Sequence, residues 1–160
     1  MNSILNKSVL IVDDDARMLR ALEKVLTGAG ARVTCASWAG DAIELLTGRQ
    51  RQMDLVITDL RMPLVTGLTV VYAIHEVFPD LPIVVLTALG SPEMKAECLR
   101  QGASAFLEKP LNTAQLVNVV EKVFARRMAG PGTAGAGPDT GSAVSREASN
   151  QENAMGGRKL

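Results

Sequence analysis

The chain has 160 residues, of which 47% are hydrophobic and 21% are charged, and its formal net charge is +0. Such a composition is typical of a soluble globular protein with one domain, and the balanced charge argues against a basic surface for nucleic acid. The N-terminal stretch has only a short apolar run before Asp13, which is too short and too acidic for a signal peptide or a membrane span. We therefore expect a cytoplasmic chain that binds neither nucleic acid nor a membrane directly.

In chain order, short apolar runs alternate with segments of helical periodicity. The run "VLIV" is typical of a strand buried on both faces, and Ser91 followed by Pro92 is a helix start signal. The sequence predicts strand 9–12, helix 16–30, strand 32–37, helix 39–48, strand 55–58, helix 66–78, strand 83–87, helix 91–102, strand 105–107 and helix 112–127. This strict alternation predicts an α/β fold, a doubly wound parallel sheet with helices on both faces.

The segment 128–160 differs from the rest of the chain, because it is rich in Gly, Ala, Pro and Ser and has no aromatic residue. It cannot bury enough apolar surface to offset the entropy of ordering, so we predict a disordered tail or linker after a domain of residues 1–127. As a flexible coil it would span roughly 30 Å.

Three residues that suggest other chemistry have plainer interpretations. Cys35 and Cys98 lie in apolar stretches without a CxxC or Cys/His cluster, so we interpret them as small buried hydrophobic residues in a reducing compartment. The single histidine, His75, lies in a helical pattern with no ligand partner nearby, and we expect no metal or base role for it.

Polar side chains follow several of the predicted strands, where parallel sheets bind their ligands. Asp13 and Asp14 follow the first strand, Asp59 ends the third, Thr87 ends the fourth, and Lys109 follows the fifth. Each residue alone could be a helix cap, a turn residue or an ordinary surface residue, but their joint occurrence at strand ends indicates one shared site.

The chemistry of this set is that of phosphoryl transfer. Clustered carboxylates without His or Cys suit Mg²⁺. A carboxylate beside that ion can act as a nucleophile toward phosphorus, and the Lys109 ammonium and Thr87 hydroxyl can neutralise or bind the phosphoryl oxygens.

At this point the chain resembles a known family, the receiver domain of two-component response regulators. The resemblance covers residues 7–127 and rests on "VLIVDDD", "LVITDLRMPLVTG", "IVVLTA" and "GASAFLEKP", in the family's order and spacing. The motifs "DLRMP" and "FLEKP" are most similar to those of regulators of the nitrogen-regulation and nitrogen-fixation types. The resemblance implies the flavodoxin-like strand order 2-1-3-4-5.

The resemblance also assigns roles residue by residue. Asp59 would be the phosphoacceptor, with Thr87 and Lys109 as its catalytic partners. Thr87 and Phe106 would form the switch, and the peptide bond from Lys109 to Pro110 would be cis. The predicted Mg²⁺ ligands are Asp13, Asp14, Asp59 and the backbone carbonyl of Arg61.

Three positions depart from the family pattern. Thr66 stands where an acid or Ser is common, Arg61 leaves a long cationic side chain free to tune hydrolysis, and Asp15 is an extra acid, which we interpret as a helix cap. None of them weakens the expectation of phosphorylation.

The implied function is a phosphorylation-activated switch rather than an enzyme, catalysing only its own phosphorylation and dephosphorylation. A sensor histidine kinase or phosphotransfer protein would supply the phosphoryl group. The surface of helix 91–102, strand 104–107 and helix 112–127 would change its binding of a downstream protein or of a second copy of the chain. The chain would be a stand-alone receiver or the N-terminal part of a longer regulator.

Two alternatives stay open at this stage. Asp13 and Asp15 superficially match the first motif of haloacid-dehalogenase-type phosphatases, although Arg17 stands where that family has Thr or Val and 160 residues leave no room for a cap domain. The other alternative is a receiver-like adaptor that acts without phosphorylation.

Overall fold

The computed structural model describes residues 2–48 and 52–130. Within these ranges strands and helices alternate as the sequence predicts. The elements are β1 Ser8–Val12, α1 Ala16–Gly28, β2 Arg32–Ala36, α2 Ala39–Thr47, β3 Leu55–Asp59, α3 Gly67–Val77, β4 Ile83–Thr87, α4 Pro92–Arg100, β5 Ala105–Glu108 and α5 Thr113–Met128.

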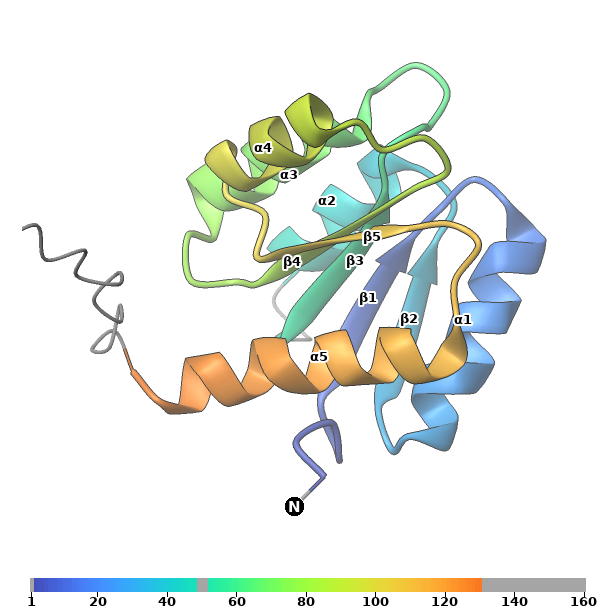
Figure 1. Cartoon of the computed structure of the whole chain (residues 1–160), viewed down its shortest axis with the longest axis vertical. Helices are drawn as coiled ribbons and strands as arrows, with labels where there is room; N and C mark the ends of the chain where they lie inside the picture. The colour runs from blue at the N-terminus through green and yellow to red at the C-terminus, as the bar shows by residue number, and fades with distance from the viewer. Residues whose placement is uncertain (1, 49–51, 131–160) are drawn as a thin grey trace, which may run out of the picture. The chain divides into compact units, whose positions relative to one another are not determined.

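The five strands form one parallel sheet in the order β2-β1-β3-β4-β5, which confirms the predicted fold class (Figure 1). The three central strands are the most apolar, because their residues are covered on both faces. Since all strands run in the same direction, the residues that end β1, β3, β4 and β5 lie along one edge of the sheet.

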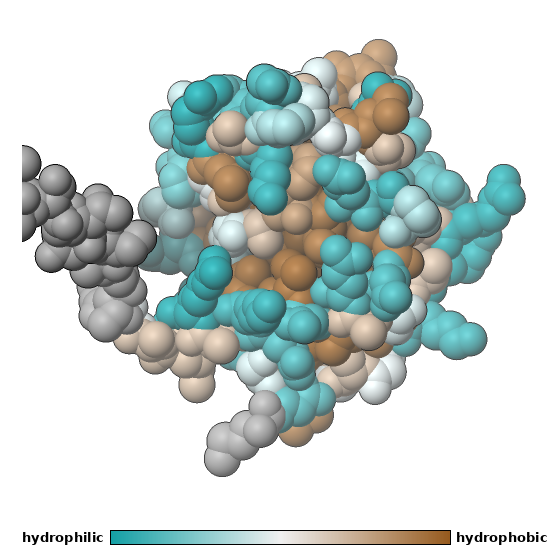
Figure 2. Space-filling model, in the orientation of Figure 1, coloured by the Kyte–Doolittle hydropathy of each residue, from teal (hydrophilic) through white to brown (hydrophobic). Residues whose placement is uncertain are grey.

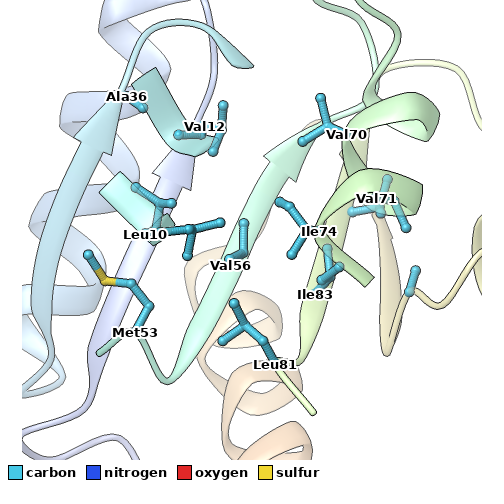
Figure 3. Packing of buried hydrophobic residues seen from close by; sticks show 14 of the residues in the cluster. Leu10, Val12, Ala36, Met53, Val56, Val70, Val71, Ile74, Leu81 and Ile83 are labelled. Atoms are coloured by element: carbon cyan, nitrogen blue, oxygen red, sulfur yellow. The ribbon is translucent and has the colours of Figure 1, made fainter. Parts of the chain in front are cut away.

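Alternate side chains of each strand enter two separate hydrophobic cores. On one face, strand residues such as Ile11, Ile57 and Leu86 pack with Leu22 and Leu26 of α1 and with apolar residues of α5. On the other face, α2, α3 and α4 cover strand residues. Figure 3 shows this second core, in which the labelled residues are Leu10, Val12, Ala36, Met53, Val56, Val70, Val71, Ile74, Leu81 and Ile83.

Local capping chemistry sets the helix starts near the predicted positions. The side chains of Asp15, Thr66, Ser91 and Asn112 each accept a hydrogen bond from a backbone N–H of the first turn. The interpretation of Asp15 as a helix cap is therefore confirmed.

Some details differ from the predictions. Cys98 is buried, but Cys35 is only half-buried, because β2 is an edge strand with one neighbour. The last helix ends at Met128, one residue beyond the predicted domain boundary. The rest of the predicted tail, 131–160, lies outside the described residues. In the part of the chain that the structure describes, no helix is long and apolar enough to cross a membrane.

Candidate functional site

An ion-pair cluster lies at the edge of the sheet where the strands end. The Lys109 ammonium lies 3.1 Å from Asp13 Oδ2 and 3.4 Å from Asp59 Oδ1. Both carboxylates are buried, with 1% and 7% of their residue surface exposed. The other Asp13 oxygen accepts a 2.9 Å hydrogen bond from the backbone N–H of Asp15. The ends of β1, β3 and β5 thus place two acids around one cation.

Asp14 completes a group of three carboxylates. Asp13, Asp14 and Asp59 each offer one oxygen, and these oxygens lie within 4.8 Å of one another. Asp14 is exposed, whereas the other two are buried, so the group opens to solvent on one side. An all-oxygen set of this kind, with room for water ligands, fits Mg²⁺ better than a softer metal.

The environment of Asp59 disfavours its charged form. Burial raises the pKa of the Asp59 carboxyl above its ordinary value, and the nearby Asp13 charge raises it further. The Lys109 ammonium and a backbone hydrogen bond from Arg61 oppose the rise. A divalent cation among these acids would favour the ionised carboxylate, which is the nucleophilic form.

The loop between β3 and α3 is tightly folded against Asp59. Arg61 forms an isolated bridge with Thr66, and the Gly67 N–H donates a 2.8 Å hydrogen bond to the Leu60 carbonyl. A Cβ atom at Gly67 would collide with the carbonyl oxygen of Asp59 and the Cα of Leu60. The Arg61 residue is exposed, and the assignment of its carbonyl as a metal ligand stays a prediction.

Thr87 ends β4 beside the acids and is fully buried. Its hydroxyl lies 3.3 Å from both the N–H and the C=O of Leu89, accepting from the first and donating to the second. Its carbonyl accepts a 2.7 Å hydrogen bond from the Lys109 N–H. A hydrogen bond therefore links the ends of β4 and β5. The Thr87 hydroxyl is hydrogen-bonded within the loop that follows β4.

Phe106 lies on β5, where it is paired with Val85 of β4 and packs against the core that α2, α3 and α4 cover. Because side chains alternate along strands, Thr87 and Phe106 project from the same face of the sheet, two residues apart in register. The peptide bond between Lys109 and Pro110 is cis.

Two features of the site were not foreseen from the sequence. The sequence predicts that Lys109 shares one site with Asp13 and Asp59 and binds the phosphoryl group, but it does not predict that Lys109 forms ion pairs with both acids. The close contact of Gly67 with Asp59 was also missed. The glycine after "LVT" was a signal for such an approach, because glycine is common where two backbones meet closely.

Comparison with known proteins identifies the class of protein that this fold and site define. The family model of the response regulator receiver domain matches residues 9–121. The chain therefore belongs to the receiver domains of two-component response regulators.

Curated relatives of the chain include three transcriptional or regulatory proteins. It is 35% identical over 120 residues to the transcriptional regulatory protein ZraR of Escherichia coli O157:H7, covering 75% of this chain and 27% of ZraR. It is 40% identical over 106 residues to the regulatory protein LuxO of Vibrio cholerae, covering 66% and 23%. The match to PrrA of Mycobacterium tuberculosis is 33% over 124 residues, covering 78% and 52%. The chain thus spans about a quarter to a half of these relatives.

Solved structures agree with the fold. The chemotaxis protein CheY4 of Vibrio cholerae superposes with a TM-score of 0.69 at 31% identity, covering 74% of this chain and 98% of that one. A second similar structure is that of the CheX-CheY-BeF3-Mg+2 complex of Borrelia burgdorferi, with a TM-score of 0.72 at 29% identity, covering 75% and 90%.

Proposed function

We propose that this receiver domain is a phosphorylation-activated switch in which Asp59 accepts a phosphoryl group from a sensor histidine kinase or a phosphotransfer protein. The observation that carries the proposal is the convergence of Lys109 on Asp13 and Asp59, with Asp14 within metal-binding distance. This convergence supports the proposal, because Asp59 could act as the nucleophile while Lys109 and the other two acids bind the phosphoryl group and a metal.

In the proposed reaction, an Asp59 carboxylate oxygen attacks phosphorus while the bond from phosphorus to the donor's imidazole nitrogen breaks. Lys109 would turn from Asp13 toward the new phosphoryl oxygens. Asp13, Asp14, Asp59 and the Arg61 carbonyl would hold Mg²⁺, which when bound neutralises the negative charge on the transferring group. The chain would thus catalyse only its own phosphorylation and dephosphorylation.

The product differs from the resting site in charge and in hydrogen-bonding capacity. A group of about −1.5 to −2 replaces a carboxylate of −1 and adds three acceptor oxygens. Thr87 would leave Leu89 to donate to one of these oxygens, and Phe106 would turn into the space that Thr87 vacates. The two arrangements form a two-state element biased by one covalent group.

The partner surface in this proposal is made by α4, β5 and α5. In Figure 1 β5 lies between the two helices on the side that faces the viewer, and Figure 2 shows apolar surface in the middle of this face. Met94 and Leu99 of α4 are among the exposed apolar residues. A downstream protein or a second copy would bind there after phosphorylation. Because the matched segment makes up only 23% to 52% of these relatives, this chain would act either alone or as the receiver part of a longer regulator.

The test is labelling of the purified chain with radioactive acetyl phosphate and Mg²⁺. We expect wild type and Asp80→Asn, which changes an exposed acid of the α3–β4 turn, to incorporate phosphate, and Asp59→Asn to incorporate none. Thr87→Ala should be labelled but should show a weaker spectral response. Equal labelling of Asp59→Asn would disprove the assignment of the phosphoacceptor. No labelling of wild type would favour the alternative, an adaptor that acts without phosphorylation.

A further inference from the structure

Gly90, in the loop between β4 and α4, lies under the Phe106 ring. A Cβ atom built on Gly90 would lie 2.9 Å from Phe106 Cε1, 3.0 Å from its Cζ and 2.9 Å from Glu108 Oε1. Two neighbouring side chains of β5 thus close over the backbone of this one residue, and the edge of the aromatic ring rests on it.

The backbone conformation does not explain why a glycine stands at this position. The φ angle of Gly90 lies outside the left-handed region, unlike that of Gly102, which is +104°. A residue with a side chain could therefore adopt the same backbone. We therefore attribute the glycine at this position to its contact with the Phe106 ring and the Glu108 carboxylate, which leave no room for a Cβ atom.

The loop that carries Gly90 begins at the candidate switch residue. Thr87 ends β4, and its buried hydroxyl is bonded to Leu89, the residue immediately before Gly90. Movement of Thr87 away from Leu89 would break both of these hydrogen bonds, next to the backbone on which the ring lies. The resting position of Phe106 thus depends on the same loop that holds Thr87.

We infer that Gly90 is a positioning residue, whose bare backbone stabilises the resting position of Phe106 and so sets the balance of the switch. This inference rests on the proposed function. A side chain at residue 90 would raise the free energy only of the arrangement in which the ring lies on that residue. The population would then shift toward the arrangement in which the loop and the ring have moved, without a phosphoryl group.

The test compares wild type with Gly90→Ala in two measurements. Without any phosphoryl group, we expect the NMR signals of the Phe106 ring to change in the variant. With saturating Mg²⁺, we expect beryllofluoride to bind the variant at least about fivefold more tightly, because a ligand and a conformational bias act on the same equilibrium. The control is Gly28→Ala, whose Cβ would meet nothing within 4 Å.

A second background separates the ring contact from other effects. Phe106→Leu removes the Cε1 and Cζ atoms and leaves Glu108 Oε1 near the new Cβ, so adding Gly90→Ala to it should change beryllofluoride affinity much less than adding it to wild type. If Gly90→Ala alone fails to fold, folding of the double variant would support the inference, and failure of both would overturn it. Unchanged ring signals, or moved signals with unchanged affinity, would also overturn it. If wild type itself binds no beryllofluoride, the proposed function fails. The NMR signals of the Phe106 ring then still test whether Gly90 positions the ring, because they are recorded without any phosphoryl group.

Discussion

The ammonium group of Lys109 lies between the carboxylates of Asp13 and Asp59, at 3.1 Å from the first and 3.4 Å from the second. The first of these pairs joins residues 96 positions apart in the chain. Removing the cation would leave two buried acids facing each other, which is costly because a buried charge needs a partner.

We therefore expect Lys109→Gln to lower the free energy of unfolding by about 2–3 kcal/mol when no divalent ion is present. Added Mg²⁺ should restore part of the loss, because it would neutralise the same acids. Urea unfolding in EDTA and in Mg²⁺ measures both effects. Lys95→Gln, at an exposed lysine of α4, is the control; an equal loss in the two variants would contradict the role of the ion pairs.

The pH dependence of stability should reveal the raised pKa of Asp59, which burial causes and the Asp13 charge increases. The folded chain binds this proton more tightly than the unfolded chain, whose pKa is near 3.8. Stability contributed by this group therefore falls as the pH rises from about 3.8 through the folded pKa, and stays lower above it.

The neutral substitution Asp59→Asn removes that penalty. In EDTA we expect the variant to be more stable than wild type at pH 7, and the difference to vanish as the pH approaches 3.8. Urea unfolding across this pH range is the measurement. A difference that stays constant with pH would show that it does not come from ionisation of Asp59.

Leu64 combines two unfavourable properties in the loop after Asp59. Its φ is +69°, and its side chain is fully exposed, at 101%. A left-handed conformation costs a leucine about 1–2 kcal/mol, while asparagine tolerates it better. We expect Leu64→Asn to stabilise the domain by about 1 kcal/mol, measured by urea unfolding. Leu89→Asn, at a residue that is also exposed but has no positive φ, should have little effect and serves as the control.

The two thiols should differ in reactivity because they differ in exposure. Burial raises the pKa of Cys98 and, together with the Glu23 charge, that of Cys35, and the reactive thiolate is disfavoured in both. Cys98 is fully buried and Cys35 half-buried. At pH 8 we expect iodoacetamide to modify Cys35 slowly and Cys98 more slowly still, read by mass spectrometry. In urea the two rates should become similar; faster modification of Cys98 in the folded chain would contradict its burial.

Much of the fold followed from local patterns in the sequence. The apolar runs of β1, β3 and β4 indicated buried strands, and Ser91 and Asn112 indicated helix starts, because burial on two faces and capping depend on neighbours in the chain. The partial exposure of Cys35 could not be predicted in this way, since it depends on β2 lying at the edge of the sheet.

For the candidate site, the order of residues along the chain was enough to identify the chemical groups at the strand ends, namely Asp13, Asp59, Thr87 and Lys109. Strand direction then required them to share one edge of a parallel sheet. The pairings became visible in the folded chain, where Lys109 bridges two acids and Gly67 and Gly90 lie against Asp59 and Phe106. The physical reason is that such contacts depend on distances of a few ångströms between loops far apart in the chain, which no local pattern encodes.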